Sequence, residues 1–89
     1  MSVVRVDTSR TLSGQLRLSV VFSNTSGREL WTEVLTDFVD TDGRVLEPAA
    51  YWEPLRLPED DVTVYAVRSA HPEAVDFSMV VRESKLSGW

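Results

Sequence analysis

Apolar and polar residues alternate along most of the chain with the two-residue period of a β-strand. The alternation is clearest over residues 12–23, where only Val21 interrupts the polar parity. The other parity consists of Leu12, Gly14, Leu16, Leu18, Val20 and Phe22. Such a pattern places one face of a strand on a core and the other toward water. Because no segment carries an apolar stripe with a helical period, the pattern predicts an all-β protein.

The largest concentration of bulky apolar side chains is the segment 29–43, ELWTEVLTDFVDTDG. Apolar residues occupy both of its parities, as expected of a central strand that is covered partly on each side. Residues 40–43, DTDG, then end the strand, because Asp side chains bond nearby amides and Gly supplies a positive φ. We expect Phe38 in this strand, and Trp52 further along the chain, to belong to the core.

Further strands are expected at residues 2–7, 44–46, 51–57, 62–69 and 75–83. The valine-rich segment 2–7 suits a sheet edge. Pro48 cannot donate to a ladder, so the region 44–57 forms another edge or a bulge. About seven short antiparallel strands with frequent turn signals are typical of an immunoglobulin- or fibronectin-like β-sandwich. We predict one such domain over residues 1–89, with 84–89 as a loose C-terminal tail.

Composition restricts the classes of function. The net charge is −5 and the nine basic residues are dispersed, which argues against nucleic acid and against anionic lipid surfaces. The chain has no cysteine, so disulfides, thiol catalysis and Cys-ligated zinc are excluded. No apolar run reaches about 18 residues, the length needed to span a membrane as a helix. The N-terminus also lacks the apolar region of a signal peptide.

Candidate chemical motifs all have simpler structural interpretations. His71 is the only histidine, and no nucleophile motif or set of metal ligands accompanies it. The segment 40–43 resembles the opening of a calcium loop, but its Gly follows the second Asp directly, so a hairpin turn is the better interpretation. The sequon at residues 24–26, NTS, is interpreted as a turn and not as a glycosylation site. We therefore predict no catalytic residues, no cofactor and no metal.

Exposed aromatic residues and an edge strand remain as candidate contacts for a partner. Tyr51 has the opposite parity to Trp52 and is the better candidate for an exposed position. Trp31 and Trp89 are further candidate platforms, and Val4 lies in the predicted edge strand. We expect Val4, Tyr51, Trp31 and Trp89 to contribute to partner binding through a sheet edge and anchoring aromatics.

The order of several short features from residue 16 to residue 83 resembles the YcfL-like family of bacterial envelope lipoproteins. These features are Asp40, Asp42-Gly43, Trp52, Leu55, Leu57, Ala66-Val67, Pro72-x-Ala74, Phe77 and Arg82. Residues 69–72, SAHP, depart from the alanine-proline approach of the family, and the lipobox cysteine is absent. The resemblance implies a small β-sandwich in the periplasm or at the outer membrane, encoded near peptidoglycan-synthase activators. It implies a lipid anchor upstream of residue 1 in a trimmed chain, and no enzymatic activity.

Three functions are therefore open to test. The first is a non-catalytic interaction domain of the bacterial cell envelope that binds a protein partner, or itself, through an edge strand. The second is a carbohydrate- or peptidoglycan-binding module that uses Tyr51, Trp31 or Trp89 as stacking platforms. The third is a structural subunit of a larger assembly, such as a phage or secretion particle. An enzyme is the class that we expect least.

Overall fold

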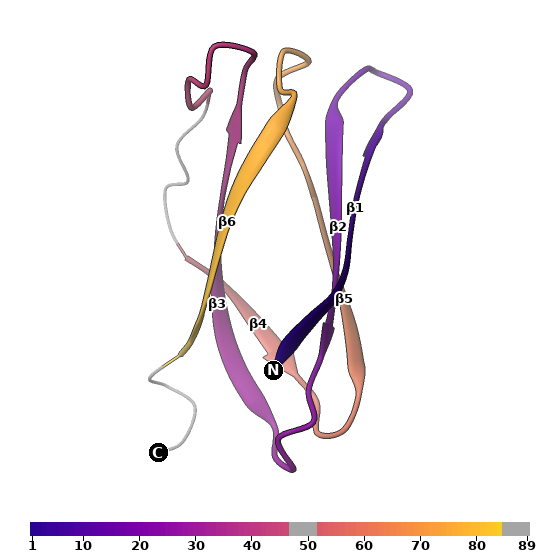
Figure 1. Ribbon diagram of the computed structural model, residues 1–89, viewed down its shortest axis with the longest axis vertical. Coiled ribbons are helices and arrows are strands. Elements are labelled where there is room, and N and C mark those ends of the chain that lie inside the picture. The colour runs from indigo at the N-terminus through magenta and orange to yellow at the C-terminus, as the bar shows by residue number, and fades with distance from the viewer. Residues whose placement is uncertain (47–51, 85–89) are drawn as a thin grey trace.

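The computed structural model describes residues 1–46 and 52–84, and this part of the chain forms two three-stranded antiparallel sheets (Figure 1). The strands are β1 (Ser2–Arg10), β2 (Leu16–Ser23), β3 (Leu30–Val39), β4 (Glu53–Leu57), β5 (Val62–Arg68) and β6 (Asp76–Glu83). Sheet A has the order β1-β2-β5 and sheet B the order β4-β3-β6. The predicted all-β sandwich is confirmed. Residues 44–46 add only an isolated bridge between Val39 and Val45, so the described part has six strands where about seven were predicted.

The core lies between the two sheets and follows the predicted alternation. Its buried members are Leu16, Leu18, Val20, Phe22, Leu30, Val34, Phe38, Leu57, Tyr65 and Ala74. Burial of each large side chain stabilises the fold by about 1.5–3 kcal/mol relative to leaving it in water. The inward parity of β2 and the placement of Phe38 in the core are confirmed. As predicted, β3 is a central strand, with β4 and β6 on its two sides.

The boundary between the first two strands differs from the prediction. β1 continues to Arg10, three residues beyond the predicted strand 2–7, because an exposed edge strand needs no apolar side chains to keep its ladder. Leu12 is fully exposed and does not begin the second strand. A tight turn holds this region: the Gly14 amide donates to the Thr11 carbonyl, and Gly14 has a φ of +83°. β2 therefore starts only at Leu16.

Trp52 is not a core residue, contrary to the prediction. Leu55 and Leu57 of the neighbouring strand β4 share the inward parity, which leaves Trp52 on the outer face of sheet B. There the guanidinium of Arg82 lies 3.8 Å from the centroid of the Trp52 ring. Arg82 also pairs with Glu33 at 3.3 Å. A cation–π contact and partial burial thus replace the expected packing in the core.

The end of β3 is the turn that the sequence predicted. One carboxylate oxygen of Asp40 accepts hydrogen bonds from the amides of Asp42 and Arg44, at 2.9 and 3.0 Å. Gly43 supplies a φ of +78°. The Asp40 carboxylate is therefore engaged by the backbone of its own turn, which agrees with a hairpin turn and not with a calcium loop.

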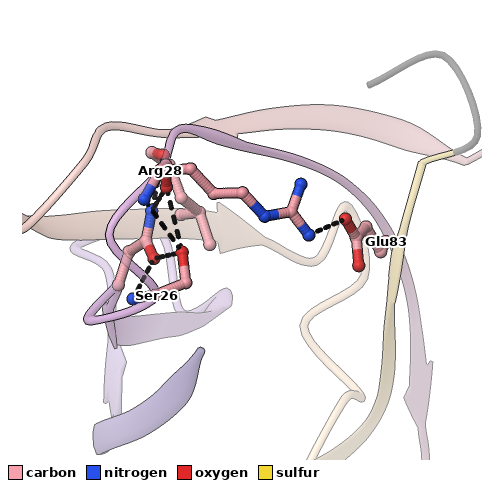
Figure 2. Close-up of polar contacts among 5 residues, drawn as sticks. Ser26, Arg28 and Glu83 are labelled. Atoms are coloured by element: carbon pink, nitrogen blue, oxygen red, sulfur yellow. Dashed lines mark hydrogen bonds and ion pairs between the residues drawn. The ribbon is translucent and has the colours of Figure 1, made fainter. Parts of the chain in front are cut away.

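Asn24, at the start of the sequon, is buried and holds the β2–β3 connection together. Its amide nitrogen lies 2.8–3.1 Å from the carbonyls of Arg28, Leu57 and Pro58, and its carbonyl accepts from Ser26. Figure 2 shows part of this network around Ser26 and Arg28, and the ion pair from Arg28 to Glu83 of β6. Because the Asn24 amide is enclosed and fully bonded, this residue has a structural role, as the turn interpretation required.

The chain leaves β6 at Ser84, which was predicted to begin a loose tail. Ser84 is buried, and its amide donates to the Trp31 carbonyl at 2.7 Å. Residues 85–89 of the predicted tail lie outside the described residues.

Candidate interaction surface at the edge of sheet A

β1 is the outermost strand of sheet A and is exposed along its whole length. All nine of its residues are exposed, and β2 is the only strand in the described part of the chain that pairs with it. Val3, Val4 and Val6 are 53%, 61% and 49% exposed. An edge strand presents a row of unpaired amide and carbonyl groups, to which another strand can add. The predicted edge position of Val4 is therefore confirmed.

The inward-facing side of β1 is exposed because the sandwich is incompletely covered on that side. β4 and β5 face each other, since the Tyr65 hydroxyl donates to Glu53 at 2.6 Å. β1 and β6 consequently form the other side, which we call the β1–β6 flank. Its inward-facing apolar residues are Val3 and Val6 of β1 and Phe77, Met79 and Val81 of β6. The three β6 residues are only partly buried, so this flank retains accessible apolar surface.

The outward-facing side of β1 carries a pair of opposite charges. Arg5 and Asp7 lie opposite Val21 and Ser19, the outward parity of β2. The Arg5 Nε and an Asp7 carboxylate oxygen are 2.5 Å apart. Both side chains are more than half exposed, so the pair itself contributes little to stability. It does place one positive and one negative group two residues apart along a free strand edge.

Features that commonly protect an edge strand are few in β1. The register against β2 shifts between Val3 and Arg5, which leaves Val4 at a bulge. No proline or lysine occurs in Ser2–Arg10, although both are frequent protective residues. From Arg5 to Arg10 the register is regular. This stretch is therefore suited to accept another strand.

Trp31, the second candidate that the structure describes, lies on the other sheet. It is 41% exposed and faces outward from β3, opposite Arg56 of β4. Arg56 forms an ion pair with Glu29 at 2.9 Å. The Arg56 guanidinium lowers the pKa of the Glu29 carboxyl, partial burial opposes the shift, and a hydrogen bond with the Trp31 side chain adds to the lowering. Trp31 and Val4 therefore do not form one surface. Tyr51 and Trp89 lie outside the described residues.

The described residues bring together no set of side chains typical of a metal centre. No group of three or more His, Asp or Glu residues in 1–46 and 52–84 is placed to hold a metal ion. His71 lies in the loop between β5 and β6, with its Nδ1 3.9 Å from a Glu73 carboxylate oxygen. In the same parts of the chain, no helix has the length and apolar character needed to cross a membrane.

Neither a protein-family model nor a curated protein matches the chain, but solved structures share its fold. The crystal structure of Campylobacter jejuni cj0090 matches with a TM-score of 0.81 and 20% identity, over 92% of this chain and 85% of that one. A DUF1425 family member from Shewanella sp. pv-4 matches with a TM-score of 0.81 and 23% identity, over 93% of this chain and 77% of the other. These likenesses establish the fold alone. The chain therefore shares the small all-β sandwich fold of these two proteins.

The sequence identified the edge strand but missed the residues that give it a specific pattern. Arg5, Val6 and Asp7 were not among the predicted contacts. The signal was present as an Arg and an Asp of one parity around a central valine. This signal can be interpreted only when the register of β1 against β2 is known, because that register shows that Arg5 and Asp7 share the outer face while Val6 faces inward.

Proposed function

We propose that this protein is a non-catalytic interaction domain that binds a protein partner by strand addition at β1. The observation that carries the proposal is a nine-residue edge strand, exposed throughout, with three exposed valines. In strand addition the main-chain hydrogen bonds supply affinity, and alternate side chains supply specificity. The apolar surface of the β1–β6 flank adds area that a partner can cover.

The setting that we propose for this activity is the bacterial cell envelope, with the chain as a YcfL-like lipoprotein of the periplasm or outer membrane. The bacterial structural neighbours support a bacterial setting, and the YcfL-like resemblance supports the envelope. The test is the gene sequence upstream of the codon for Met1, followed by metabolic labelling with a palmitate analogue. A hydrophobic segment that ends in a labelled cysteine is expected, and an upstream sequence without one contradicts the anchor.

Strand addition is tested by replacing Val4 with proline. Proline removes an amide donor and fixes φ at about −65°, so it disturbs strand pairing at the edge. The Val4→Thr variant is the matched control, because it changes the side chain while keeping the donor. Crosslinked complexes from envelope extracts should disappear with Val4→Pro and persist with Val4→Thr, with unchanged circular dichroism for both. If the folded proline variant captures the same partner as the wild type, β1 is not the binding edge.

A carbohydrate-binding function is a second proposal, supported by the position of Trp31. Its ring is partly exposed beside Glu29 and Arg56, an arrangement that combines a stacking surface with polar groups, as sugar rings require. Titration with peptidoglycan fragments should then change tryptophan fluorescence saturably in the wild type and not in Trp31→Ala. A change that persists in Trp31→Ala excludes this residue as the platform.

A further inference from the structure

We propose that β1 pairs with β1 of a second copy of this chain, antiparallel about a two-fold axis through Val6. Two copies of the three-stranded sheet A would then form one continuous sheet. The inference deepens the proposed function and rests on it, because it names the partner of the same edge. Closed two-fold pairing is the commonest symmetry of homo-oligomers.

The charge pattern of β1 is self-complementary under this symmetry. With the axis through Val6, each Arg5 lies opposite Asp7 of the other copy, and Val6 lies opposite Val6. All four charged side chains are on the outer face of the joined sheet, since Arg5 and Asp7 align with the outward residues of β2. Opposite charges in directly facing positions stabilise an antiparallel pair, whereas like charges destabilise it.

Neighbouring registers lack this match. An axis through Arg5 sets Arg5 opposite Arg5, and an axis through Asp7 sets Asp7 opposite Asp7. The Val6 register is the one that pairs Arg5 with Asp7, and Val6 is also the midpoint of the strand Ser2–Arg10. Charge complementarity and overlap of the whole strand Ser2–Arg10, the bulge at Val4 included, therefore select the same register.

In the proposed dimer, the Arg5–Asp7 ion pair within each chain would join the two Arg5–Asp7 pairs between the chains. Arg5 bonds Asp7 of its own strand, and in the joined sheet it would also face Asp7 of the second copy. Each guanidinium would then lie between two carboxylates. Because these groups are well exposed, each attractive pair adds little affinity and mainly determines register, whereas like charges in facing positions oppose the pairing. Affinity comes from the backbone ladder and from burial of apolar side chains.

The exposed apolar surface on the inner side supports the same partner. Val6 lies opposite the core residue Val20 of β2 and yet is half exposed. A second copy of the strand would cover it, together with part of the β1–β6 flank.

The net charge of β1 also permits two copies to approach one another. The chain as a whole has a net charge of −5, but Ser2–Arg10 contains two Arg and one Asp and so carries a net charge of +1. The acidic groups that would repel a second copy are therefore not concentrated at this edge.

The test is a charge-exchange series followed by sedimentation equilibrium. Wild-type protein should reach twice its mass of 10.0 kDa with a dissociation constant below about 1 mM. Arg5→Asp and Asp7→Arg should each raise this constant about tenfold or more, because each places like charges opposite one another twice. An equimolar mixture of the two variants should recover the dimer, and so should the double variant Arg5→Asp/Asp7→Arg. Both substituted positions, Arg5 and Asp7, are exposed, and circular dichroism verifies folding.

Each outcome separates the self-pairing from the more general function. If the wild-type protein remains monomeric, the proposed pairing of β1 with a second copy is wrong. Binding of another protein at β1 is tested separately, by comparing partner capture between Val4→Pro and Val4→Thr. A dimer that both single charge variants leave unchanged assigns dimerisation to another surface and likewise overturns the inference. Recovery in the mixture, together with loss in each single variant, requires Arg5 of one copy to face Asp7 of the other.

Discussion

Tyr65 of β5 and Glu53 of β4 join the two sheets through a hydrogen bond of 2.6 Å between the phenol hydroxyl and a carboxylate oxygen. The Tyr65 ring is buried in the core, so the hydroxyl reaches from the interior to the margin of the sandwich. This bond closes the β4–β5 side. The β1–β6 flank, which retains exposed apolar side chains, is the side where the proposed interface lies.

Removal of the Tyr65 hydroxyl should weaken the closed side of the sandwich. We expect Tyr65→Phe to lower the free energy of unfolding by about 1–2 kcal/mol, because a hydrogen bond to a charged acceptor is lost while the ring stays packed. In a domain of this size, 1 kcal/mol corresponds to about 4–8 °C in Tm. Urea unfolding monitored by circular dichroism measures the change.

A double-mutant cycle isolates this bond from other effects of the substitution. Glu53→Gln keeps an acceptor at the same place, and its combination with Tyr65→Phe gives the coupling free energy. We expect a coupling of about 1 kcal/mol. Additive effects of the two substitutions would contradict a direct bond between these side chains.

Two threonines on the inner face of β3 should respond to the same substitution with opposite signs. The Thr32 hydroxyl donates to the Leu55 carbonyl at 2.8 Å. The buried Thr36 hydroxyl finds no hydrogen-bond partner among the described residues. Because a buried unpaired hydroxyl is costly, Thr36→Val should raise the unfolding free energy by about 1 kcal/mol. Thr32→Val should lower it by a similar amount, about 1 kcal/mol.

The two variants serve as matched controls, since they share residue types, strand and face. Chemical denaturation of both proteins under one condition gives the comparison. A loss of stability in Thr36→Val similar to that in Thr32→Val would show that the Thr36 hydroxyl is bonded in solution.

Asn24 should be among the residues most sensitive to substitution. Its side chain is 1% exposed and bonds three carbonyls from two segments of the chain. Asn24→Ala leaves these groups without their partner and opens a cavity, so we expect a loss of about 2–4 kcal/mol. The exposed neighbour Thr25 provides the control variant Thr25→Ala, with an expected change within about 0.5 kcal/mol. Equal effects of the two variants on Tm would contradict the structural role of Asn24.

The sequence predicted the parts of the fold that depend on burial with a period of two. The inward parity of β2 and the centrality of β3 follow directly from apolar side chains at alternate positions. Residues 8–10 at the end of β1 were missed, because an exposed strand is held by backbone bonds that leave no trace in side-chain polarity. Trp52 was misplaced for a related reason: its apolar ring is partly covered by Arg82 on the outer face.

The sequence alone predicted that β1 lies at a sheet edge, but not that its charged residues are placed to complement those of a second copy. Val3, Val4 and Val6 indicate a strand from their β-branched side chains alone. The complementary positions of Arg5 and Asp7 depend on which residues of β2 they face, which is a relationship between two segments. Long-range register of this kind is not contained in the local pattern of either segment.

The ion pair beside Trp31 gives a pH-dependent prediction. Arg56 lowers the pKa of Glu29 below its ordinary value of 4.5. A carboxyl with a lowered pKa in the folded state contributes stability that is present above 4.5 and is lost as the pH falls through the lowered value. The stability difference between wild type and Glu29→Gln should therefore be present at neutral pH and disappear in acid. Because the Trp31 side chain also contributes to the lowered pKa of Glu29, tryptophan emission should change over the same pH interval, and this change should be absent from Trp31→Phe. A difference in stability that grows as the pH falls would reverse the sign required by the lowered pKa.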